Sequence, residues 1–391
     1  MVLADASASG PDQEEPDDLV EDESQQDDEG LVDIGDSTLK YFGADFDVAG
    51  LVRRLVDGDI AVPRFDPDES EGSSLEGFQR KRVWTNSRME KFIESLLLGW
   101  PVPSIFLVLD VDQRYLVLDG QQRLTSLRCF FEGRYPAGRE FVLKDVAEHL
   151  QDATYATLNT ESKRRLNNTF IQATVVEPTG PEGHESVYRL FGRLNSGGVI
   201  LTPQEIRVAL YRGPIVDWLR QLNSDSSWRS LFGAPHNRLK DHELVLRVMA
   251  MREVIEKMDG HWADGALRLI VYRPPMSEFL NKFLGNHREL QDFDADGLQA
   301  AFSSACTAVL RTMGQDGLKL AGRLNAAHVD AVLGALTYLS YRNEMPQDAV
   351  VTQGIRHLRD SEDYSLFVAR STSHRENVYR RLSAALAAFR A

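Results

Sequence analysis

The stretch that decides the fold runs from Val117 to Thr125 and reads VLDGQQRLT. Its apolar beginning is typical of a buried strand, and an apolar pattern at helical spacing follows it as far as Gly133. Gly120 stands between the two patterns, where a sharp change of chain direction favours a residue without a Cβ atom. The sequence therefore predicts a strand, a tight turn and a helix whose first turn carries polar side chains.

Three apolar runs are predicted to form strands. Ser104–Asp110 (SIFLVLD) and Tyr115–Leu118 (YLVL) are joined by a short polar turn, which is the pattern of a β-hairpin. Ile171–Glu177 is a further run rich in β-branched residues.

Two helix starts are predicted from capping boxes, in which a Ser or Thr side chain and a Glu three residues later satisfy each other's backbone amides. Ser87 with Glu90 fits this pattern, and so does Thr202 with Glu205. Pro203 suits the first position of the second helix, because it needs no backbone donor there.

The charge of the chain is distributed unevenly. Of the net charge of −15, the first 36 residues contribute 14 acidic residues and no Lys or Arg, so residues 37–391 carry −1. The stretch 1–36 also lacks aromatic residues, and a composition this polar predicts a disordered acidic tail. The near-neutral remainder leaves contact with nucleic acid open, although the total charge is negative.

The domain organisation follows from where strand patterns end. They end near Gly213, and helix-length apolar patterns dominate the rest of the chain. The sequence therefore predicts an α+β protein, with a mixed α/β domain at residues 37–212 and an all-helical domain at residues 213–391.

Cysteine usage and hydropathy limit the compartment. Cys129 and Cys306 are too few for a disulfide framework or a four-cysteine zinc site, and both are expected to be small buried side chains. No apolar run reaches the ~20 residues of a membrane span, and the acidic beginning does not resemble a secretion signal. We therefore expect a soluble, cytoplasmic protein without a membrane partner.

The turn after the predicted strand is the first candidate site. A helix start offers free N–H groups and the positive end of the helix dipole to an anion, and Arg123 adds a planar cation suited to phosphate. Asp119 is placed to hold Mg²⁺ or to polarise an attacking water. In the alternative interpretation Asp119 only caps the helix and Arg123 forms a surface ion pair. The candidate residues from this stretch are Asp119, Gly120, Gln121, Gln122, Arg123 and Thr125.

A glycine-rich loop is the second candidate. Residues 193–198 read RLNSGG and lead towards the predicted helix at Thr202. Paired glycines permit positive φ angles and close approach of the backbone to a ligand. Arg193, Asn195, Ser196 and Gly197 are therefore candidates to bind a base, a ribose or a phosphate, with Arg207 on the other flank. A plain connection between two helices is the alternative.

A basic and aromatic segment is the third candidate. Phe78–Trp84 reads FQRKRVW, and three basic residues beside two aromatic rings suit a polyanion or a transferring phosphoryl group. Gln79 and Arg80 are the candidate residues. The alternative is a solvated basic face with Trp84 in the core.

Motifs of several other enzyme classes are absent from the sequence. It contains no Walker-type G-x-x-x-x-G-K-[ST] and no G-x-S-x-G elbow, and its histidines are not paired with cysteines. Residues 371–377 (STSHREN) are interpreted as a helix start, followed by a basic surface helix with Arg375, Arg380 and Arg381.

In their order along the chain, these motifs resemble the N-terminal domain of the GmrSD-type, modification-dependent restriction endonucleases. That domain is related to the ParB/sulfiredoxin nucleotide-binding fold. The resemblance covers about residues 45–215 and rests above all on the DGQQR and RLNSGG motifs, with Gln79–Trp84 and Leu98–Pro103 (LGWPVP) in support.

The resemblance implies nucleotide-dependent action in bacterial anti-phage defence. In that family the DGQQR segment is associated with binding and hydrolysing a nucleoside triphosphate, so this chain is expected to be an NTPase that uses Mg²⁺. The catalytic residues would be Asp119, Gln122 and Arg123. The residues carried into the phosphate and metal site are Asp119, Gln121, Gln122 and Arg123, with Gln79 and Arg80 facing them and Asn195, Ser196 and Gly197 near the nucleotide.

Two-domain members of that family add a C-terminal HNH-type nuclease. Residues 213–391 contain no histidine-led metal motif of that type, so cleavage of DNA by this chain alone is not expected. We expect DNA and a separate nuclease subunit as partners, and the sequence leaves a homo-oligomer open.

Two alternative functions are kept. A non-hydrolysing DNA sensor would use the basic segments Arg80–Arg82 and Arg375–Arg381. A nuclease of the ParB-like fold would cut DNA with a metal ion on Asp119.

Overall fold

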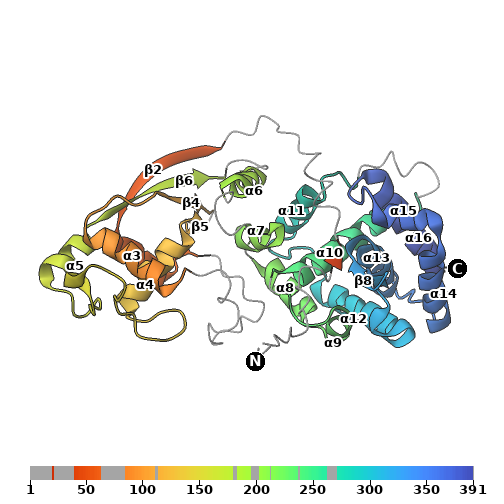
Figure 1. The fold of residues 1–391 in the computed structure, drawn as a ribbon. Coiled ribbons are helices and arrows are strands. Elements are labelled where there is room, and N and C mark those ends of the chain that lie inside the picture. The colour runs from red at the N-terminus through yellow and green to blue at the C-terminus, as the bar shows by residue number, and fades with distance from the viewer. Residues whose placement is uncertain are drawn as a thin grey trace, which may run out of the picture.

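The computed structural model describes residues 20–21, 39–62, 84–110, 113–178, 183–194, 202–211, 213–236, 238–261 and 271–390. Figure 1 shows a lobe that combines a sheet with helices beside a second lobe made almost entirely of helices. This confirms the predicted α+β fold class, with a mixed α/β first part and a helical second part. The domain boundaries at residues 37–212 and 213–391 stay predictions.

The first lobe is built on a five-stranded mixed sheet. Its strands are β2 (Lys40–Asp47), β3 (Ile60–Ala61), β4 (Ile105–Leu109), β5 (Tyr115–Asp119) and β6 (Phe170–Glu177), in the order β2-β6-β4-β5-β3. β4 and β5 form the predicted antiparallel hairpin, and β6 is the predicted strand that pairs with β4 in parallel. β2, which pairs antiparallel with β6 along the edge of the sheet, was not predicted from the sequence.

Four α-helices accompany one face of the sheet. They are α2 (Val48–Asp57), α3 (Asn86–Leu97), α4 (Gln121–Glu132) and α5 (Thr160–Asn167), and a short 3₁₀ helix spans Glu148–Leu150. Ile105, Leu107 and Val117 point into the core that these helices share. The alternate residues of the same strands belong to a different core, because successive side chains of a strand point to opposite faces.

That second core runs from the sheet into the helical lobe. Val108, Leu116, Leu118 and Val176 of the sheet belong to the same hydrophobic cluster as the buried residues of the helices from α6 onward. The two lobes are therefore joined by continuous apolar packing as well as by the chain.

The helical lobe surrounds two central helices, α10 and α13, which are buried on nearly every side. Its α-helices, in chain order after α6 (Gly183–Leu194), are α7 (Pro203–Leu210), α8 (Pro214–Asn223), α9 (Ser226–Phe232), α10 (Lys240–Met258), α11 (Met276–Asn286), α12 (Ala295–Met313), α13 (Ala326–Tyr341), α14 (Asp348–Asp360), α15 (Glu362–Ala369) and α16 (Arg375–Arg390), with a 3₁₀ helix at Gly314–Asp316.

A small sheet interrupts the helical lobe. β7 (Lys319–Leu320) pairs antiparallel with β8 (Arg323–Asn325), so the mostly helical second part also contains two short strands. β1 (Val20–Glu21) pairs with β8 in parallel. These two residues of the acidic stretch 1–36 are therefore ordered, where the sequence predicted disorder, because a sheet edge far along the chain supplies their backbone partners.

A buried ion network crosses the core of the helical lobe. The carboxylate of Asp330 accepts hydrogen bonds from Arg247 (Nη2–Oδ2 2.9 Å) and from Arg381 (Nε–Oδ1 3.1 Å). All three side chains are fully buried. Because an unpaired charge is very costly away from water, the three side chains hold α10, α13 and α16 together as a unit.

Cys129 and Cys306 are both buried, as predicted. Burial raises the pKa of the Cys129 thiol to about 11 and raises that of Cys306 as well. Both side chains therefore act as small apolar groups.

Candidate functional site

The candidate site is centred on the turn between β5 and α4, where the sequence placed it. Asp119 is the last residue of β5, and Gly120 turns the chain with a φ angle of +95°. A Cβ atom on Gly120 would lie only 2.5 Å from Cγ2 of Ile105. Glycine is needed here for its backbone conformation and for the close packing of β4 against the turn.

Arg123 fixes the shape of this turn from inside. Its side chain is only 10% exposed, and Nη2 donates to Oδ2 of Asp119 at 2.7 Å. Nη1 donates to the backbone carbonyl oxygens of Pro103 and Ser104. These bonds use three of the five guanidinium N–H groups, so Arg123 ties β5, α4 and the segment before β4 to one another.

The charges of this pair affect each other. Burial lowers the pKa of Arg123 from its ordinary value, and the carboxylate of Asp119 opposes that effect. The Asp119 side chain is 47% exposed, so one end of the buried ion pair reaches solvent at the mouth of the turn. The predicted alternative of a surface pair therefore fits Asp119 but not Arg123.

Gln122 connects the turn to the segment that follows the basic stretch. Its Oε1 accepts a hydrogen bond from the backbone N–H of Trp84 at 3.0 Å, and the Trp84 ring packs edge-on against Phe92 of α3. The FQRKRVW segment thus ends against the first turn of α4. Trp84 is half-buried beside the core, as in the alternative interpretation of that segment.

The first turn of α4 offers backbone donors. Gly120 is its N-cap and supplies no side-chain acceptor to the amides that follow. The side chains of Gln121 and Thr125 are half-buried on the outer part of the helix. An anion at this point would meet free N–H groups and the positive end of the dipole of a 12-residue helix.

A metal ion at this turn would need most of its ligands from the phosphates of a bound nucleotide. In the described part of the chain, no group of three or more His, Cys, Asp or Glu residues is placed to hold one. Asp119 offers one half-exposed carboxylate. This fits Mg²⁺, which commonly binds through one or two carboxylates together with the phosphates of a nucleotide.

Several sequence-predicted site residues lie outside the described residues. These are Gln79 and Arg80 of the basic segment and Asn195, Ser196 and Gly197 of the loop. Arg193 lies in the last turn of α6, and its side chain is also outside the described part.

The helix after the loop begins as predicted. Thr202 and Glu205 form the capping box of α7, with Pro203 at its first position. Arg207, however, does not face the loop as a ligand clamp. It is 1% exposed and bonds Glu243 of α10 (Nη1–Oε1 3.2 Å) and Asn281 of α11 (Nε–Oδ1 2.9 Å), because its position on α7 points into the core.

Two further sequence-based interpretations are corrected. The cap of α3 is Thr85, whose hydroxyl accepts the N–H of Arg88, whereas Ser87 bonds Asp145 and Glu90 is buried. Arg381 was assigned to a basic surface helix available to DNA, but it is fully buried against Asp330.

Residues 68–212 match the family model described as GmrSD restriction endonuclease, N-terminal domain. This chain carries a GmrSD N-terminal domain. The matched range contains the β5–α4 turn and α7, and it connects the chain with restriction systems. No curated protein and no solved structure matched the chain. Among the described residues, no helix is both long and apolar enough to cross a membrane.

The sequence did not reveal that two backbone carbonyl groups hold Arg123 in this GmrSD N-terminal domain. Pro103 and Ser104 accept from Arg123 through backbone atoms, which leave no mark in the side-chain pattern. The available signal was the proline pair at 101 and 103, which favours an extended segment leading into β4.

Proposed function

We propose that the β5–α4 turn binds the phosphates of a nucleoside triphosphate and hydrolyses it, as part of a restriction system. The observation that carries this proposal is the helix start itself: α4 begins at a left-handed glycine without a side-chain cap, beside a buried arginine and a half-exposed carboxylate. The three features together suit a phosphate that arrives with a cation.

The carboxylate of Asp119 means that a phosphate can bind at this turn only together with a cation. A phosphate next to Asp119 would be repelled, and Mg²⁺ between the two would remove that repulsion and neutralise charge that develops on the phosphate oxygens. Asp119 would hold this Mg²⁺ through its exposed side. Arg123 keeps Asp119 in position through the 2.7 Å bond, and its positive charge also acts on the phosphate.

Gln121 and Gln122 are the polar side chains nearest to the amides. Gln122 is oriented by its bond to Trp84, which leaves its NH₂ group to donate to a phosphate or to an attacking water. Asp119 or a glutamine would orient that water, and Gln79 and Arg80 would add contacts from the facing segment. Asn195, Ser196 and Gly197 would contact the nucleotide from the loop before α7.

The test is binding and turnover with each of the four NTPs. Calorimetry would measure the Kd with Mg²⁺, and phosphate release would be followed with and without DNA. We expect Asp119→Asn to lower phosphate release at least about 100-fold, because loss of one charge-stabilising group costs that much in comparable sites. Gln121→Ala should weaken binding with little change in folding, because this side chain is half-buried and outside the core.

A variant of Arg123 needs a control for folding, because removing its side chain also leaves the carbonyl oxygens of Pro103 and Ser104 without these hydrogen bonds. Arg123→Lys keeps the positive charge but loses the several N–H donors of the planar guanidinium group. Thermal unfolding must therefore be measured together with activity. Arg311→Ala is the control, since Arg311 is exposed on α12 and far along the chain from the site. If the folded wild type binds none of the four NTPs, the proposal is wrong.

The partners follow from the same proposal. Turnover at this site would be coupled to DNA and to a separate nuclease subunit, because the sequence after residue 213 lacks an HNH-type metal motif. Stimulation of phosphate release by DNA would support this coupling, and identical rates with and without DNA would count against it.

A further inference from the structure

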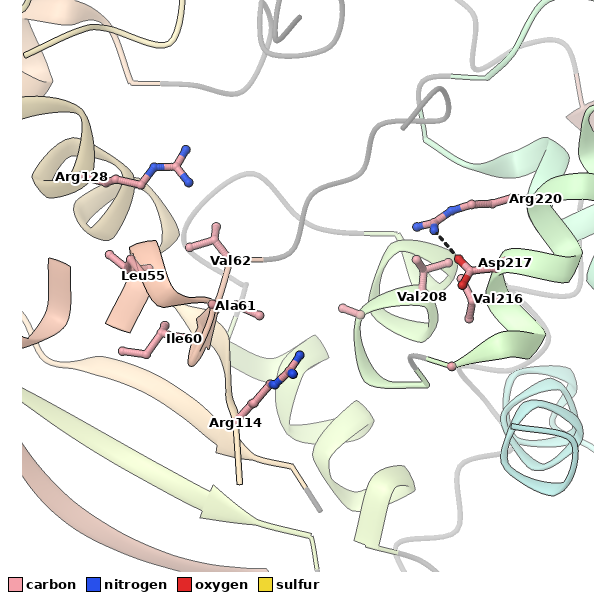
Figure 2. Close-up of a pocket in the computed structure, with 13 residues that line it drawn as sticks. Leu55, Ile60, Ala61, Val62, Arg114, Arg128, Val208, Val216, Asp217 and Arg220 are labelled. Atoms are coloured by element: carbon pink, nitrogen blue, oxygen red, sulfur yellow. Dashed lines mark hydrogen bonds and ion pairs between the residues drawn. The ribbon is translucent and has the colours of Figure 1, made fainter. Parts of the chain in front are cut away.

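A cavity of about 490 Å³ lies between the two lobes, away from the β5–α4 turn. Leu55 of α2 and Ile60 of β3 line it from the first lobe, and Val208 of α7 and Val216 of α8 line it from the second. Figure 2 shows these two sets of side chains on opposite sides of the open space. The volume is within the range of pockets that hold one nucleotide-sized molecule.

Three arginines from three different elements line the cavity. Arg114 precedes β5, Arg128 lies on α4 and Arg220 lies on α8. In Figure 2 the guanidinium groups of Arg128 and Arg220 extend towards each other across the space, and Arg114 extends into it from below. Among the described residues that line the cavity, Asp217 is the only acidic one, so these residues together have a formal charge of +2.

Two of these arginines pair with acidic side chains that are themselves more than half exposed. Arg128 approaches Glu132 at 3.7 Å, and its Nε has no hydrogen-bond partner among the described residues although the atom is buried. Arg220 donates from Nη1 to Oδ1 of Asp217 at 2.8 Å, but the Asp217 side chain is 67% exposed, so solvent screens this ion pair. Both arginine side chains are partly exposed (22% for Arg128 and 33% for Arg220), so an anionic ligand in the cavity would receive charge-assisted hydrogen bonds from their accessible N–H groups.

The other residues that line the cavity are apolar, and three of them are only partly buried. Ala61 and Val62 follow one another along and after β3, and Val208 faces them from α7. Each of the three is partly exposed to the space. A flat apolar or aromatic group would bury these side chains while the arginines held a charged group beside it.

We propose that this cavity binds one nucleotide unit, with its base against the apolar wall and its phosphate between Arg128 and Arg220. The ligand is either a free nucleoside monophosphate or one nucleotide of a DNA strand, since both present the same base and phosphate. The site uses none of the residues assigned to triphosphate binding, so it is independent of the proposed function. The ligand would contact α4 on one side and α8 on the other.

Direct binding to the full chain tests the proposal. The probes are dAMP, a ten-residue single-stranded oligo(dA), and deoxyadenosine as the ligand without phosphate. Wild type should bind dAMP or the oligonucleotide at least about tenfold more tightly than deoxyadenosine, because charge-assisted hydrogen bonds to the phosphate carry the affinity. Binding of dAMP assigns the free nucleotide as ligand, and binding of the oligonucleotide alone assigns the strand.

The variants locate the binding. Arg128→Gln and Arg220→Gln should each raise the Kd about tenfold, and Arg220→Glu should raise it further by placing a negative charge beside the phosphate. Arg311→Ala, which removes an exposed arginine and its ion pair with Asp348, is the matched control and should keep the wild-type Kd. The proposal is overturned if neither probe binds, if deoxyadenosine binds as tightly, or if the Arg128 and Arg220 variants keep the wild-type Kd while thermal unfolding shows them folded.

Discussion

His328 makes the stability of the helical lobe depend on pH. It lies in the first turn of α13 and is fully buried, with Nδ1 2.9 Å from the hydroxyl of Tyr364. Its Nε2 has no hydrogen-bond partner among the described residues. Burial, assisted by the charge of Arg359, lowers the pKa of His328 to about 3. Between about pH 3 and pH 6.5 the folded protein therefore holds this imidazole neutral, whereas the unfolded chain protonates it.

The size of the effect follows from the two pKa values. The unfolded pKa is 6.5 and the folded pKa about 3, so as pH falls below 6.5 the unfolded state alone takes up the proton. At about pH 5 the difference is worth about 2 kcal/mol, since each pH unit below the unfolded pKa contributes about 1.36 kcal/mol. His242, whose pKa is lowered to about 4 by burial, adds a loss of similar size in the same range. The wild type should therefore lose about 4 kcal/mol of unfolding free energy between about pH 8 and pH 5.

The assay is urea unfolding followed by circular dichroism at several pH values in that range. His328→Gln removes the titrating group but keeps an acceptor for Tyr364, and it should halve the loss of unfolding free energy. The lower limit of pH 5 avoids a second contribution: Glu253 and Asp259 have pKa values lowered to about 2, and the stability that they supply is lost only at more acidic pH.

The comparison with an exposed histidine decides the result. His357 lies on the exposed side of α14, and His357→Gln should keep the wild-type pH dependence because solvent reaches this side chain in both states. A constant loss at every pH in His328→Gln would reflect packing and leave the reasoning intact. The reasoning is refuted if His328→Gln and wild type lose the same unfolding free energy between pH 8 and pH 5.

Asp330→Ala should lower the unfolding free energy by about 3–5 kcal/mol, because it removes the buried carboxylate that Arg247 and Arg381 share, and urea unfolding would measure this. Asp348→Ala, which removes the exposed partner of Arg311, should leave the midpoint near that of wild type. Gly120→Ala should cost about 2 kcal/mol through its left-handed φ angle and abolish nucleotide binding, and a variant with wild-type melting and wild-type Kd would contradict that role. Removal of Mg²⁺ with a chelator should stop phosphate release and weaken NTP binding in calorimetry, because the phosphate then meets the Asp119 carboxylate directly; undiminished release would show that Asp119 does not act through a metal ion.

The parts of the fold that the sequence predicted are those fixed by local contacts. The hairpin of β4 and β5, the turn at Gly120 and the capping box of α7 each depend on residues within a few positions of one another. β2 was missed because it lies at the edge of the sheet, where the pattern KYFGADFD is neither strongly apolar nor cleanly alternating. Its partner, β6, is more than a hundred residues away.

The candidate site shows the same division. The sequence predicted the turn correctly but not the directions in which Glu90 of α3 and Arg207 of α7 point. Glu90 resembled a cap residue, yet it accepts bonds from Tyr135 and from the backbone of Lys144, which lie 45 and 54 residues away. Arg207 resembled a loop clamp, yet its partners are on α10 and α11. Side chains of this kind satisfy distant groups, and a one-dimensional pattern cannot show which ones.

The buried bonds of Arg207 join the region that matches the family model to helices that lie beyond the end of that match. The GmrSD match ends at residue 212, just after α7, but the inner face of α7 belongs to the helical core and its arginine is neutralised by Glu243. A chain cut at residue 212 would expose that face and would lose Glu243, which pairs with the buried guanidinium of Arg207. The end of the family match at residue 212 is therefore not a place where the chain can be cut without dividing a shared hydrophobic core.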